Sequence, residues 1–140
     1  MSVYLDASIL ISFFVNDSFS DRADELLHRE PGTVIVSDFA AAEFSAVVGR
    51  KVRTGDLGLD NSGAVFADFD DWSSQVAQKA ETTTQDIAAA MSFLRRADLA
   101  LRVPDAINIA LSRRLGAVLA TFDLRMARSA EALGLAVVEV

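Results

Sequence analysis

The chain has 140 residues, of which 51% are hydrophobic, and it carries a net charge of −7. This length fits one domain over residues 1–140 with a hydrophobic core, and the composition is too apolar for a disordered chain. The sequence has no cysteine. That excludes disulfides, zinc–thiolate sites and thiol nucleophiles, and it fits a reducing cytoplasm.

The apolar residues are spread along the chain, and no uncharged run approaches the roughly 18 residues that a membrane span needs. The N-terminus lacks an early Lys or Arg, and Asp6 interrupts its apolar stretch. We therefore expect no signal peptide, no membrane contact and a cytoplasmic location. The acidic net charge argues against a general nucleic-acid coat protein. Basic residues cluster after position 50, which predicts solvated helix faces or a basic rim around an acidic centre.

The predicted elements alternate between short apolar strands and helices. In the first half of the chain we expect a strand at 3–5, helices at 7–16 and 21–30, a strand at 33–36, and helices at 38–54 and 59–73. In the second half we expect a helix that starts near 82–86 and runs over 87–96, and another helix at 105–115. A strand at 117–120, a helix at 123–133 and a strand at 136–140 complete the prediction. Pro104 suits the first turn of a helix, and Gly116 suits a helix end. This alternation predicts an α/β domain with a mainly parallel sheet.

Acidic side chains follow three of the predicted strands. Asp6 comes directly after the first strand, Glu43 lies on the helix after the second, and Asp123 comes shortly after the third. Asp105 opens a further, mostly apolar helix. Functional groups gather at the carboxyl ends of parallel strands, so we expect these acids to lie near one another. Each alone has a structural explanation: helix capping for Asp6 and Asp123, a favourable place in the helix dipole for Asp105, and pairing with an arginine for Glu43.

Together, these acids predict a metal site. Two carboxylates about 5 Å apart repel by roughly 3 kcal/mol at an effective dielectric of 20, so a cluster needs a counter-charge or stays partly protonated. Mg²⁺ and Mn²⁺ prefer oxygen ligands, and the only histidine, His28, is isolated. A carboxylate-only site favours phosphodiester chemistry, in which the cation activates a water and neutralises charge on the phosphate.

At these residues the sequence resembles the PIN-domain ribonucleases, and most closely the VapC toxins of bacterial toxin–antitoxin pairs. The resemblance rests on YLDASIL at 4–10, SDFAAAEFSAVVGRK at 37–51, LRVPDAINIALSRRLGAVLATFD at 101–123 and the final strand. It implies a three-layer α/β/α fold around four to five short, mainly parallel strands. It also implies that the catalytic and metal-binding quartet is Asp6, Glu43, Asp105 and Asp123. Ser8 and Thr121 match hydroxyl residues of the family, and we expect them to orient the metal ligands.

The resemblance further implies an endoribonuclease that depends on Mg²⁺ or Mn²⁺ and leaves a 5′-phosphate. Such a protein would be the toxin of a type II toxin–antitoxin pair, a homodimer, and neutralised by a VapB-type antitoxin whose C-terminal segment covers the active site. It would contact DNA only through the antitoxin. Candidate contacts with substrate or antitoxin are Arg50, Lys51, Arg53 and Asn108, and we interpret Asn108 mainly as a tolerated helix residue. Phe122 stands where the family often has a small or polar residue.

Three alternatives stay open. The chain could be a PIN nuclease of RNA processing without an antitoxin, or a catalytically weak PIN-like binding or scaffold module. A phosphoryl-transfer enzyme with Asp6 as nucleophile fits less well. Ser8 stands where a dehalogenase-like enzyme needs a second aspartate, and receiver-like domains need a lysine that Lys51 and Lys79 supply poorly. The sequence names neither the RNA nor the antitoxin.

Overall fold

The structure is a computed structural model that describes residues 1–29 and 32–138 of the chain. Within these residues, four strands form one parallel sheet in the order β3-β2-β1-β4. The strands are β1 (Ser2–Leu5), β2 (Thr33–Ser37), β3 (Gln78–Ala80) and β4 (Val118–Ala120). The predicted α/β class with a mainly parallel sheet is confirmed.

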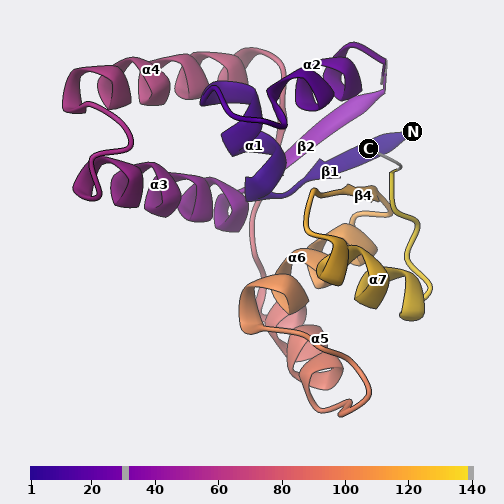
Figure 1. The fold of residues 1–140 in the computed structure, drawn as a ribbon. Helices are drawn as coiled ribbons and strands as arrows, with labels where there is room; N and C mark the ends of the chain where they lie inside the picture. The colour runs from indigo at the N-terminus through magenta and orange to yellow at the C-terminus, as the bar shows by residue number, and fades with distance from the viewer. Residues whose placement is uncertain (30–31, 139–140) are drawn as a thin grey trace.

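Seven helices in the same part of the chain cover both faces of this sheet (Figure 1). They are α1 (Ala7–Phe14), α2 (Ser20–Arg29), α3 (Asp38–Arg53), α4 (Leu59–Gln75), α5 (Thr84–Leu94), α6 (Val103–Arg114) and α7 (Leu124–Ala132). Figure 1 shows α1 to α4 on one side of the strands and α5 to α7 on the other, which is the expected three-layer arrangement. No helix in the described ranges is long and apolar enough to span a membrane.

Two separate hydrophobic clusters hold the layers together, and β1 contributes to both. Val3 and Leu5 point to the face covered by α1, α3 and α4, whereas Tyr4 points to the face covered by α5, α6 and α7. This division follows from the alternation of side chains along a strand. All three side chains are buried, so β1 is fixed from both sides. That makes its carboxyl end a rigid place for a functional group.

Two predictions about strands were wrong. β3 is a real edge strand that pairs with β2, but its sequence Gln78-Lys79-Ala80 is polar and largely exposed, so it carries no apolar signal. The strand predicted at 136–140 is reduced, in the described residues, to an isolated bridge between Val137 and Leu119. Residues 139–140 lie outside the described part, as does residue 30 of the predicted second helix.

Candidate active site

The candidate acids lie where strands of the sheet end and helices begin. Asp6 follows β1 and caps α1 by accepting a hydrogen bond from the Ile9 backbone N–H. Asp123 follows β4 and caps α7 through the Arg125 and Met126 backbone N–H groups. Because β1 and β4 are neighbouring parallel strands, their carboxyl ends bring these two aspartates to the same edge. The capping roles considered for them are therefore real, and they also fix the two carboxylates in place.

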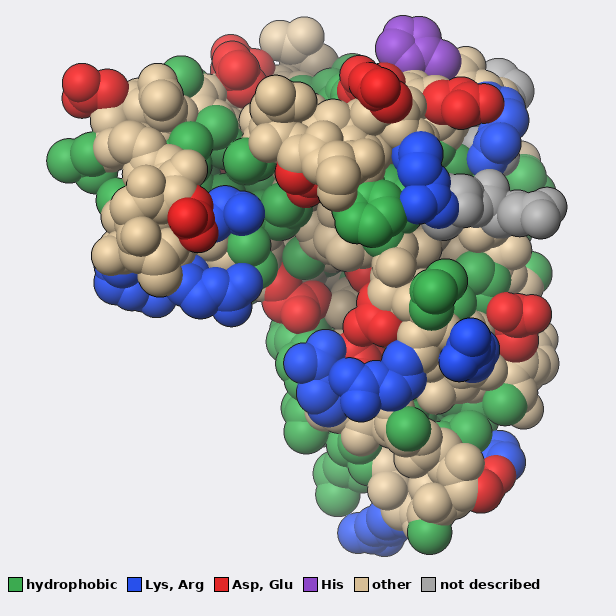
Figure 2. Space-filling model, viewed as in Figure 1, with side chains coloured by type: hydrophobic (Ala, Val, Ile, Leu, Met, Phe, Trp, Pro, Cys, Tyr) green, Lys and Arg blue, Asp and Glu red, His purple; other side chains and the backbone are tan. Residues whose placement is uncertain are grey.

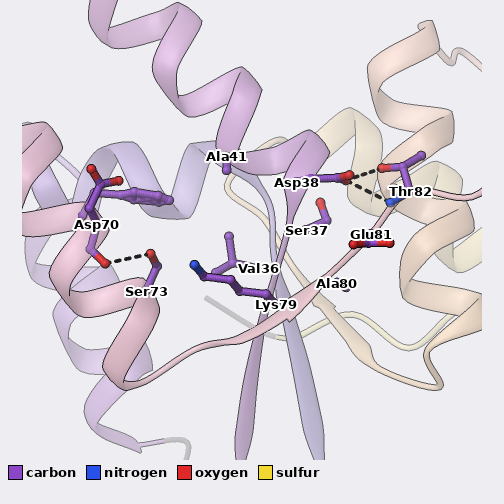
Figure 3. Close-up of a pocket in the computed structure, with 11 residues that line it drawn as sticks. Val36, Ser37, Asp38, Ala41, Asp70, Ser73, Lys79, Ala80, Glu81 and Thr82 are labelled. Atoms are coloured by element: carbon purple, nitrogen blue, oxygen red, sulfur yellow. Dashed lines mark hydrogen bonds between the residues drawn. The ribbon is translucent and has the colours of Figure 1, made fainter.

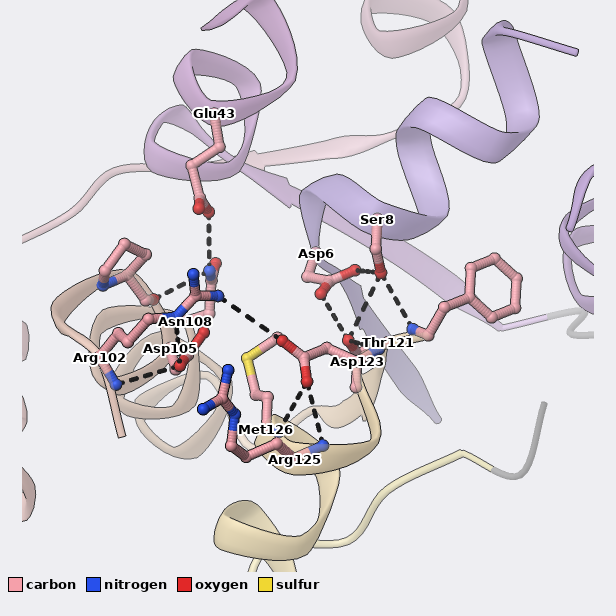
Figure 4. Close-up of polar contacts among 12 residues, drawn as sticks. Asp6, Ser8, Glu43, Arg102, Asp105, Asn108, Thr121, Asp123, Arg125 and Met126 are labelled. Atoms are coloured by element: carbon pink, nitrogen blue, oxygen red, sulfur yellow. Dashed lines mark hydrogen bonds and ion pairs between the residues drawn. The ribbon is translucent and has the colours of Figure 1, made fainter. Parts of the chain in front are cut away.

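Asp105 and Glu43 approach the same region from two other helices. Asp105 lies in the first turn of α6 and is buried, while Glu43 lies in the second turn of α3 and is half-buried. Figure 4 shows the Glu43 side chain pointing from α3 towards α6. Figure 2 shows acidic side chains in the hollow between the two halves of the molecule, with Lys and Arg side chains on both sides of it.

Ser8 and Thr121 hold the Asp6 carboxylate from both sides. Ser8 Oγ donates to Asp6 Oδ1 at 2.6 Å, and Thr121 Oγ1 donates to Asp6 Oδ2 at 2.5 Å. Thr121 Oγ1 also accepts a hydrogen bond from the Asp123 backbone N–H at 2.9 Å. The predicted contacts of the two hydroxyls with an acid are thus present. Their influence on a metal stays a prediction.

The Asp6 carboxyl has a raised pKa. Burial is the main cause and the negative charge of Glu43 adds to it, so the pKa is about 6 despite the lowering effect of the hydrogen bonds from Ser8, Thr121 and the Ile9 backbone. A cation beside this carboxylate would favour the charged form.

Asn108, on α6, positions the Glu43 side chain of α3. Its amide Nδ2 donates to Glu43 Oε1 at 2.8 Å and to the Pro104 carbonyl at 3.0 Å, while its Oδ1 accepts from the Tyr4 hydroxyl at 2.6 Å. Asn108 is only 2% exposed. The interpretation of Asn108 as a merely tolerated helix residue is therefore wrong, because a buried amide with three partners is a structural bridge. Its place three residues after Asp105, one turn along the same helix face, was the available signal.

Arg102 lies among the acids, and sequence reasoning missed this. As the N-cap residue of α6, it places its Nε 3.4 Å from Asp105 Oδ2 and its Nη2 3.7 Å from Asp123 Oδ2. The pKa of Glu43 is raised, mainly by burial and also by the negative charge of Asp105. The Asn108 hydrogen bond and the positive charge of Arg102 lower it in part. Arg102 therefore neutralises part of the negative charge in the hollow.

The four acids fit a divalent cation in their chemistry, since all of them offer hard carboxylate oxygens. In the described residues, no group of three or more Asp, Glu or His side chains is close enough to hold a metal as it stands. Asp105 and Asp123 instead face Arg102. The structure thus brings the four acids to one hollow and pairs two of them, Asp105 and Asp123, with the guanidinium of Arg102.

The remaining candidates lie farther away. Arg50, Lys51 and Arg53 occupy the last turn of α3. They are 7–10 residues beyond Glu43, which is roughly 10–15 Å along the helix. A second hollow, of about 470 Å³, lies at the carboxyl ends of β2 and β3 and includes none of the predicted site residues (Figure 3). There, Asp38 Oδ1 accepts hydrogen bonds from the backbone and hydroxyl of Thr82 and ties α3 to the segment after β3.

The model of the PIN domain family matches residues 3–132, which is most of the chain. The chain belongs to the PIN-domain family. No match is found among curated proteins.

Several solved structures share this fold. Mycobacterium tuberculosis VapC20, described as a Sarcin-Ricin loop cleaving toxin, is 21% identical, with 99% of each chain covered and a TM-score of 0.76. FitAcB from Neisseria gonorrhoeae is 14% identical, with 98% of this chain and 96% of that one covered and a TM-score of 0.73. VapBC-1 from nontypeable Haemophilus influenzae is 17% identical, with 99% and 98% covered and a TM-score of 0.66. At these identities, the likeness establishes the fold.

Proposed function

We propose that this PIN-domain protein is a cytoplasmic endoribonuclease that depends on Mg²⁺ or Mn²⁺, and that it acts as the VapC-type toxin of a type II toxin–antitoxin pair. The observation that supports this proposal is that Asp6, Glu43, Asp105 and Asp123, on or next to four different helices, face one hollow of the molecule. Similar folds in the Sarcin-Ricin loop cleaving toxin VapC20 and in VapBC complexes support the same assignment.

In the proposed mechanism, the four carboxylates would hold one or two cations, which would supply an activated water and neutralise charge on the scissile phosphate. The chain's own residues prepare this arrangement. Ser8 and Thr121 prevent Asp6 from rotating, and Asn108 directs Glu43 into the hollow. Arg102 is 63% exposed beside Asp105 and Asp123, so its guanidinium can turn towards a phosphate group and donate parallel hydrogen bonds to two of its oxygens.

We also propose a VapB-type antitoxin as the partner, with its C-terminal segment covering this hollow. Arg50, Lys51 and Arg53 at the end of α3 would contact the RNA backbone or an acidic antitoxin segment. A homodimer is the proposed assembly. The exposed apolar side chains of Ile87 and Met91 on α5 and of Val103 at the start of α6 support such a contact.

Cleavage of structured RNA by the purified protein tests the nuclease. We expect cleavage with Mg²⁺ or Mn²⁺, loss of cleavage in EDTA, and at least a hundredfold loss for Asp6→Asn, because the ligand charge disappears. Asp68→Asn, an exposed aspartate on α4, is the matched control and should cleave normally. Cleavage that persists in EDTA, or that Asp6→Asn leaves unchanged, would disprove the metal mechanism.

The contacts of Arg102 with Asp105 and Asp123 favour one second candidate, a PIN-like module that binds RNA without cutting it. The same assay separates the two functions. A scaffold module would retain RNA in a gel-shift experiment, show no cleavage with either cation, and lose no RNA binding on Asp6→Asn.

A further inference from the structure

Two phenylalanine rings and an arginine stack beside the candidate active site. The rings of Phe19 and Phe122 lie 5.0 Å apart between centroids, with 26° between their planes. The Arg22 guanidinium carbon is 5.2 Å from the Phe19 centroid and 5.1 Å from the Phe122 centroid. We call Phe19, Arg22 and Phe122 the aromatic stack. Phe19 is 39% exposed and Arg22 is exposed, so the stack borders solvent.

The aromatic stack is tied directly to the acids. Phe122 lies between Thr121 and Asp123, and its backbone N–H donates to Ser8 Oγ at 2.9 Å. The same Ser8 hydroxyl donates to Asp6 at 2.6 Å. Two hydrogen bonds therefore set the place of the Phe122 backbone relative to the Asp6 carboxylate. A ligand that rests on the stack would have a defined position relative to the proposed cleavage centre.

A depression of about 380 Å³ connects the two rings of the stack with one of the four candidate acids, Asp123. Its lining includes Phe19 and Phe122 together with Ser8 and Asp123, and Ile11 and Val47 add apolar wall. If the stack only fastened the start of α2 to the segment before α7, burying Phe19 and Arg22 would serve that purpose better. The exposed Phe19 ring and Arg22 guanidinium, beside the half-buried Phe122 ring, instead favour a surface for a flat partner.

We propose that this depression binds one unstacked nucleobase of single-stranded RNA next to the scissile phosphate. This inference rests on the proposed nuclease function and names a substrate subsite within it. Proteins bind splayed RNA bases on aromatic rings and arginine planes, and the aromatic stack combines both. The positive Arg22 also suits the polyanionic RNA backbone in a chain whose net charge is −7. An apolar peptide side chain would match the walls but gain nothing from the guanidinium.

Replacing the rings by leucine tests the proposal, because leucine keeps apolar volume but removes the π face. The probe is an RNA hairpin that the protein cleaves in Mg²⁺, with the cut site mapped. Its binding is then measured by fluorescence anisotropy in Ca²⁺, with intactness checked on a gel. We expect Phe19→Leu and Phe122→Leu each to bind the hairpin about tenfold more weakly, in line with the usual contribution of one stacked base. Phe13→Leu, a half-buried ring on α1 that packs on Phe14 and Trp72, is the control.

A second probe identifies the base. Hairpins with one abasic nucleotide on either side of the cut should show a single position where wild-type binding falls about tenfold, and Phe19→Leu should not weaken that hairpin further. Equal binding of wild type and Phe19→Leu, with Phe19→Leu folded by circular dichroism, would overturn the subsite while leaving the nuclease intact. If wild type neither binds nor cleaves any RNA, the proposed function fails and the subsite fails with it. Phe19→Leu decides the question even if Phe122→Leu does not fold.

Discussion

Asn108 donates a 2.8 Å hydrogen bond to Glu43, a residue 65 positions earlier in the chain. Its other side-chain atom, Oδ1, accepts a hydrogen bond from the hydroxyl of Tyr4, which is fully buried on β1. These two contacts leave the amide one orientation, because the donor must face Glu43 and the acceptor must face Tyr4. These hydrogen bonds thereby join β1, α3 and α6 next to the acidic hollow.

Replacing Asn108 by leucine should both destabilise the fold and slow RNA cleavage. The buried Tyr4 hydroxyl would lose one of its two hydrogen-bond partners and Glu43 would lose its donor, at a cost of about 1–3 kcal/mol in the free energy of unfolding. Urea denaturation measures the first effect, and single-turnover cleavage the second. Asn61→Leu, on the exposed surface of α4, is the control. If Asn108→Leu matches this control in both measurements, the bridge has no role.

Removing the positive charge of Arg102 should strengthen cation binding. The guanidinium faces Asp105 and Asp123 and lowers the pKa of Glu43, so it opposes a second cation in the hollow. Because Arg102 is mostly exposed, we expect Arg102→Gln to bind Mn²⁺ only about fivefold more tightly, or roughly 1 kcal/mol. Isothermal titration in the absence of RNA measures this, with the exposed Arg95→Gln as control. Weaker binding by Arg102→Gln would mean that the guanidinium supports the site instead of competing with a cation.

The stability of the metal-free protein should fall as pH rises through about 4 to 6. Burial first of all raises the pKa of Asp6 from its ordinary 3.8 to about 6, so the folded state holds this proton more firmly than the unfolded chain does. At pH 7.5 in EDTA, Asp6→Asn should therefore be more stable than wild type by up to about 3 kcal/mol. At pH 4.5 the difference should shrink. Urea denaturation at both pH values tests this, and a difference that does not vary with pH would contradict it.

The ion pair between Asp86 and Arg114 should matter for the packing of α5 on α6. Burial alone would raise the pKa of Asp86, but hydrogen bonds from Arg114 and Thr83 and the Arg114 charge outweigh it and lower the pKa. This contribution is present above the ordinary aspartate pKa and is lost as pH falls through the lowered value. Arg114→Met would leave the Asp86 carboxylate, which is 1% exposed, without its ion-pair partner. This change should lower the free energy of unfolding by about 2 kcal/mol at pH 7. Thermal unfolding of Arg114→Met beside the neighbouring Arg113→Met gives the comparison.

Much of the fold could be predicted from local pattern, because buried strands and helices carry apolar residues at a regular spacing. β1 and β2 lie in the middle of the sheet, β4 lies at one edge beside the bridge to Val137, and all three strands have apolar sequences. β3 lies at the other edge, where one side needs no apolar cover, and Gln78-Lys79-Ala80 therefore resembles a loop. Val137 pairs with Leu119 only through a single bridge, although its apolar neighbours suggested a full strand.

The candidate acids could be predicted because strand ends and helix starts locate them, as with Asp6 after β1 and Asp123 at the start of α7. The groups that hold or neutralise them could not. Asn108 reaches Glu43, and Arg102 reaches Asp123, across distances in the chain that no local pattern encodes. These pairings depend on how α3, α6 and α7 pack, which only the folded structure reveals.

The central claim is that Asp6, Glu43, Asp105 and Asp123 together hold one or two divalent cations. The most direct test is the anomalous difference map of a crystal soaked in Mn²⁺. We predict a peak in the acidic hollow within about 2.0–2.6 Å of oxygens from at least two of the four carboxylates, as hard cations require, and no such peak in an Asp6→Asn crystal. A fully ordered hollow with no peak at saturating Mn²⁺, or a peak that survives Asp6→Asn unchanged, would contradict the claim.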